Sequence, residues 1–499
     1  MMKNKNRHRA VIKGKIRFSL SHFFIFSFFI LLAACSDYES FSDNPNFRLS
    51  FSADTIAFDT LISTIPSSTK TLYAFNKNND GIRISTIRLE GGASSHFRVN
   101  VDGRYLAGGA WNDFEVLGGD SLVVRIEMTP PEVGSNEPLY FTDKLHFFLE
   151  NGAQQTVVLS GGALDAYIKK GGLIIESDET LLTDKPYVIY DSLVVAPGVT
   201  LTLPQGCTLM FHDQTSLLVH GTLKANGTLA QPVTLRGDRT DRMFPYLPYD
   251  NTPNRWGGVH FFADSKNNEL TQCDIHSGDY GIICDSTALT EDSDPLLLME
   301  DCIVHNIGGP GLVFTHCRTQ VTGTQISNTL GRCVDIEGGA HVFVHCTIAQ
   351  FYPLSASRDD ALYMADMEGE DIYRPLLWCY FVNCVITGYA DDVVMGNLAE
   401  NTFDDVDLLF QNSLLRTVVS DDSRFVDIRY DLPDSLEVTG KDHFVLFDTD
   451  NFLYDFAPDS LSAIRGLADS EYSKLFPIDR RGVSRLADGE PDAGAYEGK

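Results

Sequence analysis

The chain has 499 residues, of which 43% are hydrophobic and 21% charged. This is the composition of a folded protein long enough for two or more domains. The formal net charge at pH 7 is −29, and the first 34 residues carry seven basic side chains and no acidic one, so the rest of the chain carries −29 minus these seven, or −36. A body this acidic argues against nucleic acid or a bare anionic surface as the partner, and is compatible with a glycan or with Ca²⁺.

Residues 1–35 form a targeting segment. A basic stretch is followed by the run Phe23–Ala34, which is apolar except for Ser27 and too short to span a bilayer as a helix. The ending Leu32-Ala33-Ala34-Cys35 resembles the bacterial lipobox. The resemblance implies that the segment is a signal peptide and that Cys35 is acylated and becomes the new N-terminus. An ordinary secretory signal or a short membrane anchor is the alternative.

The linker 36–46 is polar and acidic. Asp37 and Glu39, directly after Cys35, resemble the surface-export signals of some Gram-negative lipoproteins. Together with the lipobox, they predict a lipoprotein of the outer membrane that faces the cell surface.

Residues 47–166 predict a separate β-sandwich. Short runs, alternating in Ile82–Ile84 and mostly apolar in Ser121–Ile126, are divided by turn signals such as Asn79–Gly81. No helical period appears. The run from Phe75-Asn76 to His96–Asn100 resembles the Ig-like domains that precede β-helices in bacterial surface lipoproteins. The resemblance implies a spacer between the lipid anchor and the rest of the protein.

A repeat dominates residues 268–417. Each unit has a turn-forming or polar residue, then a small residue, then mostly aliphatic positions, and the small residues stand at positions 273, 302, 324, 346, 384 and 413. The intervals fit a base period of 22 residues with 7 or 16 residues added where the chain loops out. Units this short hold three strands and three bends, which predicts a parallel coil whose turns are stacked at about 4.8 Å.

Ten cysteines do not predict a disulfide framework in a chain of this size. The nine that remain after Cys35 are an odd number, so at least one thiol is unpaired within the chain. In the repeat register, Cys273 should stack on Cys302 and Cys346 on Cys384, within reach of a disulfide. An inward ladder of small apolar side chains is the favoured interpretation over disulfides or metal.

Residues 170–262 begin the coil with strands of three to five residues bounded by glycine. Ala225–Thr228, Pro232–Leu235 and Arg255–Val259 resemble the opening turns of bacterial pectin-lyase-like proteins. The resemblance implies an all-β protein in which residues 170–417 form a right-handed parallel β-helix.

Residues 418–499 hold the last coils and a closing segment. Its ending, Pro491–Glu497, resembles the C-terminal motif of surface β-helix proteins of the choice-of-anchor type. The resemblance implies a cap over the open end of the β-helix. Its ion pairs are expected to come from four charged residues, Asp479, Arg481, Arg485 and Asp492.

Two loops carry the candidate site residues. In the loop 238–254, Tyr246 and Tyr249 could form a platform for a sugar, although packing of the loop on its own coil is the simpler interpretation. The loop 353–374 adds Tyr363 as a further candidate aromatic.

Acidic residues near the loop 353–374 define a second candidate site. The candidates are Arg358, Asp359, Asp360, Asp391 and Asp392. Pectate-type lyases hold Ca²⁺ with carboxylates and use Arg or Lys as the base, so these residue types permit such a site. A solvated acidic rim is the favoured interpretation of these residues.

No transition-metal site is predicted. His341 and His345 lie four residues apart on an alternating strand, so both should point one way. Cys346 should face the other way, which opposes a joint site. The sequence therefore favours a lipid-anchored surface protein that binds a glycan or a partner without catalysis. A polysaccharide lyase or glycoside hydrolase acting beside the loop 353–374 is the alternative.

Overall fold

The computed structural model describes residues 40–290, 293–368, 372–398 and 406–498. They fall into two compact units. The first is built around Thr69–Glu127 and Thr142–Leu159, and the second runs from Ser160 onwards with two earlier segments, Ala57–Ser68 and Met128–Phe141.

Two five-stranded sheets follow the linker, held by antiparallel pairs such as β3–β8 and β4–β7. In spatial order, the first contains β1 (Ser50–Phe51), β3 (Lys70–Phe75), β8 (Ser121–Met128), β5 (Phe97–Val101) and β6 (Arg104–Tyr105). The second contains β2 (Thr55–Ile62), β10 (Gln154–Leu164), β9 (Leu139–Leu149), β4 (Ile82–Leu89) and β7 (Ala110–Val116), and two short 3₁₀ turns are η1 (Gly92–Ser94) and η2 (Ala107–Gly109). Phe51 of one sheet packs on Phe147 of the other with ring centroids 4.9 Å apart, so the inner faces meet as in a β-sandwich.

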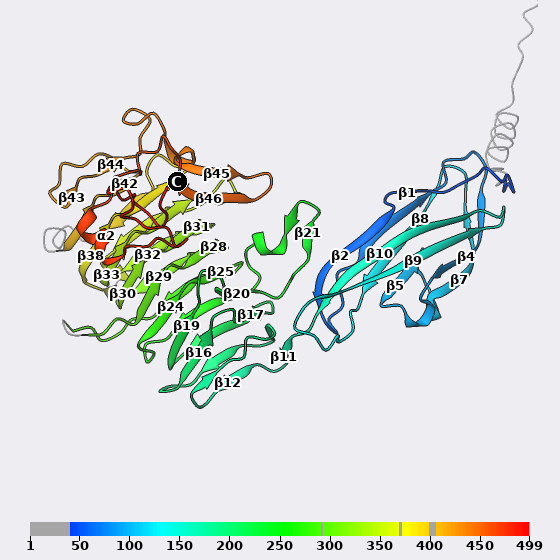
Figure 1. Ribbon diagram of the computed structural model, residues 1–499, viewed down its shortest axis with the longest axis horizontal. Helices are drawn as coiled ribbons and strands as arrows, with labels where there is room; N and C mark the ends of the chain where they lie inside the picture. The colour runs from blue at the N-terminus through cyan, green and yellow to red at the C-terminus, as the bar shows by residue number, and fades with distance from the viewer. Residues whose placement is uncertain (1–39, 291–292, 369–371, 399–405, 499) are drawn as a thin grey trace, which may run out of the picture. The chain divides into compact units, whose positions relative to one another are not determined.

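From Tyr167 the chain winds into a coil with three parallel sheets, and Figure 1 shows its strands stacked in chain order. Sheet 1 contains β11 (Tyr167–Lys169), β14 (Tyr187–Ile189), β17 (Thr208–Phe211), β20 (Val233–Gly237), β25 (Cys273–His276), β28 (Ile303–Ile307), β31 (Gln325–Thr329), β34 (Thr347–Gln350), β39 (Val385–Gly388), β42 (Leu414–Leu415) and β44 (Arg429–Tyr430). Sheet 2 contains β12 (Leu173–Ile175), β15 (Leu193–Val195), β18 (Ser216–Val219), β23 (Gly258–Phe261), β26 (Ile282–Cys284), β29 (Leu312–Thr315), β32 (Val334–Glu337), β35 (Leu362–Ala365) and β40 (Val394–Asn397). Sheet 3 contains β13 (Glu179–Thr180), β16 (Thr200–Pro204), β19 (Thr222–Asn226), β24 (Asn268–Thr271), β27 (Leu297–Glu300), β30 (Arg318–Thr322), β33 (Gly339–Val344), β38 (Leu376–Val382), β41 (Asp407–Gln411) and β43 (Phe425–Val426).

Short elements decorate the coil. They are the hairpins β21 (Arg242–Phe244) with β22 (Leu247–Pro248), β36 (Met367–Glu368) with β37 (Ile372–Tyr373), and β45 (Phe444–Asp448) with β46 (Leu453–Pro458), together with η3 (Tyr249–Asn251), η4 (Gly440–His443) and the helix α2 (Ser470–Leu475).

The predicted ladder of small residues is confirmed. Asp274 pairs with Ile303 and Thr347 with Val385, which aligns Cys273 with Cys302 and Cys346 with Cys384 on neighbouring coils. All six ladder side chains are fully buried, and the nine cysteines from Cys207 to Cys384 are free thiols inside the coil. Burial raises the pKa of the Cys207 thiol to about 12, so this thiol stays protonated. The nine buried cysteines serve as small core residues.

The residue before each small residue makes a corner between sheet 3 and sheet 1. All six such residues adopt left-handed backbone angles, with φ between 47° and 56°, and they are Gln272, Asp301, Gly323, His345, Asn383 and Asn412. Glycine, asparagine and aspartate tolerate this conformation best, which explains why turn formers open most of the repeat units. The side chains at four of the corners point away from the core and contact residues 467–480; they are Gln272, His345, Asn383 and Asn412.

Stacked phenylalanines fill the last coils. Phe343, Phe381, Phe410 and Phe425 lie on successive strands of sheet 3, with neighbouring ring centroids 4.8, 4.9 and 5.1 Å apart and nearly parallel ring planes. The first three rings are fully buried. Because parallel strands repeat at nearly the same spacing, the backbone register itself sets the stacking distance.

The C-terminal segment lies along the side of the coil, although the sequence predicts a cap over its open end. Its contacts reach from Asn412, whose side chain donates to Leu467 O at 3.1 Å, back to Gln272, whose side chain donates to Arg480 O at 3.2 Å. Between them, Gly494 N donates to Asn383 O at 2.8 Å. The outward corner side chains therefore hold this segment across several coils.

An apolar layer lies under the C-terminal segment. Outward residues of sheet 1, among them Ala349, Val385 and Leu414, are covered by Phe444 and Phe456. This part of sheet 1 is apolar on both faces, so it needs a cover along its side, which is the physical reason for the observed placement.

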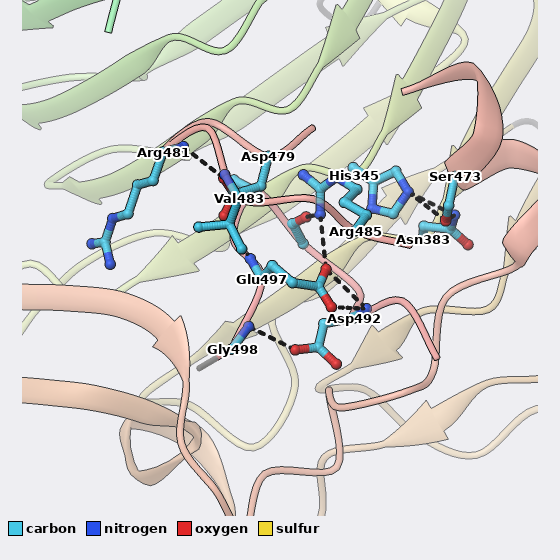
Figure 2. Close-up of polar contacts among 12 residues, drawn as sticks. His345, Asn383, Ser473, Asp479, Arg481, Val483, Arg485, Asp492, Glu497 and Gly498 are labelled. Carbon is cyan, nitrogen blue, oxygen red and sulfur yellow. Dashed lines mark hydrogen bonds and ion pairs between the residues drawn. The ribbon is translucent and has the colours of Figure 1, made fainter. Parts of the chain in front are cut away.

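The charged residues that were predicted to form ion pairs in the cap have other partners in the structure. Arg481 pairs with Asp455 at 2.7 Å, and Asp479 accepts the backbone N–H groups of Arg481 and Val483 (Figure 2). Arg485 is buried, donates to Gly494 O at 3.1 Å and lies 3.9 Å from Glu497 (Figure 2). Buried aspartates thus satisfy backbone donors of an irregular segment instead of pairing with the arginines.

The C-terminal segment should become less stable as the pH rises. Burial and the adjacent Asp492 carboxylate raise the pKa of Glu497 from 4.5 to about 8. A raised pKa in the folded state gives stability that is complete below the unfolded pKa and is lost as the pH rises through the folded one. At about 1.4 kcal/mol per pKa unit, the stability lost over this pH range is a few kcal/mol.

The Glu497→Gln variant keeps the side-chain shape without the titration. Its unfolding free energy in urea, measured near pH 5 and near pH 8, should fall less over this interval than that of the wild type. An equal fall in both proteins would contradict the assignment to Glu497.

Candidate functional site

Three of the five predicted acidic-loop residues gather in one place. Burial raises the pKa of Asp360, Arg332 offsets part of the rise, and Asp359 and Asp392 add to it, so the three carboxylates share one electrostatic neighbourhood. Arg332 also pairs with Asp335 of sheet 2 at 2.8 Å. The cation among these acids is therefore Arg332, which the sequence analysis did not select.

The other two predicted residues have structural partners. The Arg358 guanidinium lies 4.4 Å from the Tyr389 ring centroid. Asp391 is 86% exposed and pairs at 3.1 Å with Arg416, which also contacts the buried Asp431. These contacts separate Asp391 from the group around Arg332.

The three predicted tyrosines differ in accessibility. The Arg239 guanidinium covers Tyr249, with its Cζ 4.1 Å from the ring centroid. The Arg332 guanidinium covers Tyr363 in the same way, at 3.5 Å. Tyr246 is 63% exposed. The Tyr249 and Tyr363 side chains are half-buried, so Tyr246 is the most exposed of the three.

Tyr246 belongs to residues 238–254, which we call the arm. Figure 1 shows the hairpin β21–β22 of the arm projecting from the coil. Phe244 is 49% exposed and stacks on Tyr246, with centroids 5.7 Å apart and an angle of 10° between the planes. Arg239 makes a bidentate pair with Asp241 at 2.8 and 2.7 Å, which braces the base of the arm.

A polar cluster lies beside the base of the arm, on the outer face of sheet 1. Asp274 Oδ1 is 2.9 Å from His276 Nδ1 and 3.1 Å from His305 Nε2. Among the residues that the structure describes, one group of three or more His, Cys, Asp or Glu side chains has all its ligand atoms within 4.8 Å of one another. These three residues are that group. From the arm, Asp250 Oδ1 is 3.4 Å from His276 Nε2 and pairs with Arg236 at 2.5 Å.

Opposite charges stabilise the ionised forms in this cluster. Burial favours the neutral imidazole of His276, but the Asp274 and Asp250 carboxylates raise its pKa to about 9. Burial likewise opposes ionisation of Asp274, yet His276 and His305 hold its pKa well below the usual range. The cluster can thus bind a proton between two carboxylates, or a cation in its place.

The sequence analysis missed this cluster, although the repeat contains its signal. His276 and His305 each stand three positions after a ladder cysteine, so the same 29-residue interval that aligns Cys273 with Cys302 also aligns the two imidazoles. Extending the repeat to its fifth position would have paired them.

The prediction that His341 and His345 point the same way is wrong. β33 ends at Val344, so His345 takes the left-handed corner and turns outward, where its Nε2 lies 3.0 Å from Ser473 Oγ. His341 stays inside the coil, 2.8 Å from Thr319 Oγ1. The corner breaks the alternation on which the prediction depended.

Residues 1–35, with the predicted lipidation site Cys35, lie outside the described residues. In the ranges that the structure does describe, no helix has the length and apolarity needed to cross a membrane.

Comparison with solved structures gives low overall similarity. A PapD-like domain of human CEP192 shares 14% identity over 25% of this chain and 90% of its own, with a TM-score of 0.17. A family 123 glycoside hydrolase from Clostridium perfringens shares 7% identity over 23% and 26%, with a TM-score of 0.18, and the E. coli chaperone DraB shares 15% over 24% and 55%, with a TM-score of 0.16. These scores carry no argument about fold or function.

Comparison with curated proteins finds no match. Residues 249–350 match a family model described as a right handed beta helix region. The matched range lies within the three parallel sheets, and it includes the cluster of Asp274, His276 and His305. The coil is therefore a right-handed parallel β-helix in an all-β chain.

Proposed function

We propose that the protein is a lipid-anchored β-helix protein of a Gram-negative cell surface that binds a glycan without catalysis. The observation that carries the proposal is the exposed pair of nearly parallel, stacked rings, Phe244 and Tyr246, on the arm. Flat aromatic faces bind the apolar faces of sugar rings, and polar groups nearby fix their orientation.

The arm suits this role because its base is held rigid. The pair Arg239–Asp241 and the Arg239 guanidinium over Tyr249 tie its two ends together. Asp250 is held by Arg236, and its backbone O accepts from Ser277 Oγ at 2.7 Å. A platform that is already ordered loses little conformational entropy when it binds.

Replacement of Tyr246 should weaken glycan binding. In calorimetric titrations of the protein lacking residues 1–35 with neutral and acidic polysaccharides, Tyr246→Ala should bind about tenfold more weakly, the equivalent of about 1.4 kcal/mol for one lost stacking face. Tyr140→Ala is the matched control, since Tyr140 is 71% exposed and belongs to a different part of the chain. Equal affinity of the wild type and Tyr246→Ala would contradict the proposal.

The lipid anchor is tested separately in the full chain. Expressed in a Gram-negative host, the wild type should incorporate labelled palmitate and sediment with membranes, because several acyl chains on one residue give stable anchoring. Cys35→Ser should lose both properties, while Ser36→Ala should keep them. Membrane sedimentation of a palmitate-free Cys35→Ser protein would contradict the lipid anchor.

The alternative function is a polysaccharide lyase beside the loop 353–374. It is favoured by the grouping of Asp359, Asp360 and Asp392 around Arg332. A lyase would release unsaturated sugars, so ultraviolet absorbance that grows when polysaccharide is added would support it, and Asp360→Asn would abolish the signal. Binding without such absorbance supports the non-catalytic function.

A further inference from the structure

The outer face of sheet 1 carries a group of donors that neither the glycan platform nor the acidic loop requires. On β25, Asp274 and His276 are two residues apart and therefore point the same way. His276 pairs directly with His305 of β28 in the strand register. Two rigid neighbouring strands thus bring three side chains to one spot.

The distances fit a small metal ion. Imidazole and carboxylate donors surround Zn²⁺ at about 2.0–2.2 Å, which places tetrahedral ligand atoms about 3.3 Å apart. In the cluster, the Asp274 oxygen is 2.9 Å from His276 Nδ1 and 3.1 Å from His305 Nε2. All three ligand atoms lie within 4.8 Å of one another, so small side-chain shifts bring them to the spacing around an ion.

The surroundings fit as well. A metal-binding histidine usually presents its second nitrogen to a carboxylate that fixes its orientation. His276 Nε2 lies 3.4 Å from Asp250, which is itself held by Arg236. His276 is nearly buried, whereas Asp274 and His305 are 30% and 26% exposed, so an ion has access from solvent.

We propose that Asp274, His276 and His305 bind a divalent transition metal ion such as Zn²⁺, with Asp250 orienting His276. The two imidazoles select such an ion over Ca²⁺, which prefers a set of six to eight oxygen ligands. Three protein ligands leave one coordination position for water or for a polar group of a bound molecule.

The test is a titration of the metal-free protein lacking residues 1–35 with Zn²⁺ and with Co²⁺. We expect one equivalent of Zn²⁺ to bind, and Co²⁺ to give a tetrahedral absorption spectrum without thiolate bands, which separates this site from the nine cysteines. His305→Ala and Asp274→Asn should lose the spectrum. Asp250→Asn should keep it with about 10–100-fold weaker affinity.

His260→Ala is the matched control. His260 is 27% exposed and lies 2.7 Å from Asp285, so it has the exposure and the carboxylate partner of His305 without a second imidazole in register. Its loss should leave the titration unchanged. No saturable binding by the wild type, or unchanged binding by His305→Ala, would overturn the proposal and leave a hydrogen-bonded charge network only.

Discussion

Replacing Phe381 by alanine is expected to lower the free energy of unfolding by about 3–5 kcal/mol. Phe381 is fully buried at the centre of the phenylalanine stack, 4.8 Å from the Phe343 ring and 4.9 Å from the Phe410 ring. The change removes a ring between two flat neighbours and leaves a cavity that rigid strands cannot close. Urea unfolding followed by circular dichroism measures the loss.

An exposed phenylalanine provides the control. Phe244 is 49% exposed on the arm, so Phe244→Ala should change the unfolding free energy by no more than about 0.5 kcal/mol. If Phe381→Ala were equally mild, the stack would not be a main source of stability in the last coils.

Replacing Arg485 by methionine is expected to cost about 3–5 kcal/mol and to release the C-terminal segment. Arg485 is 1% exposed, donates to Gly494 O and lies near Glu497 (Figure 2). Methionine fills a similar volume but leaves these acceptors buried without their cation. Urea unfolding measures the loss of unfolding free energy. Faster proteolysis of the chain beyond residue 466 reports the release of the C-terminal segment.

A second arginine of the same segment provides the control. Arg481 is 36% exposed and pairs with the half-buried Asp455, so Arg481→Met should cost about 0–1 kcal/mol. Adding Glu497→Gln to Arg485→Met should recover part of the loss, because it removes a buried carboxyl group that the arginine no longer faces. Equal costs for the two arginine variants would contradict a special role for burial.

The coil could be predicted because its sequence repeats. Cys273 and Cys302 align at the interval that the sequence shows, since one turn of a parallel coil adds a fixed set of strands and corners. The same rule contained the pairing of His276 with His305. The repeat aligns every position of one unit with the same position of the next. The prediction of stacking was made only for the small core residues.

Side-chain contacts outside the repeat could not be predicted. Nothing in the order of residues says that Arg239 covers Tyr249 or that Arg332 covers Tyr363. Likewise, the place of the C-terminal segment depends on outward apolar residues of sheet 1, such as Val385, that look like ordinary strand residues. Such choices are made by tertiary packing, which has no periodic signal.

The position of the bound glycan tests the proposed function most directly. Hydrogen–deuterium exchange of the protein lacking residues 1–35, with and without a bound polysaccharide, locates the contact through the backbone amides. Our proposal predicts that protection is concentrated in the arm, residues 238–254, beside Phe244 and Tyr246. Protection concentrated in residues 353–368 would instead contradict it and place the ligand beside the acidic loop.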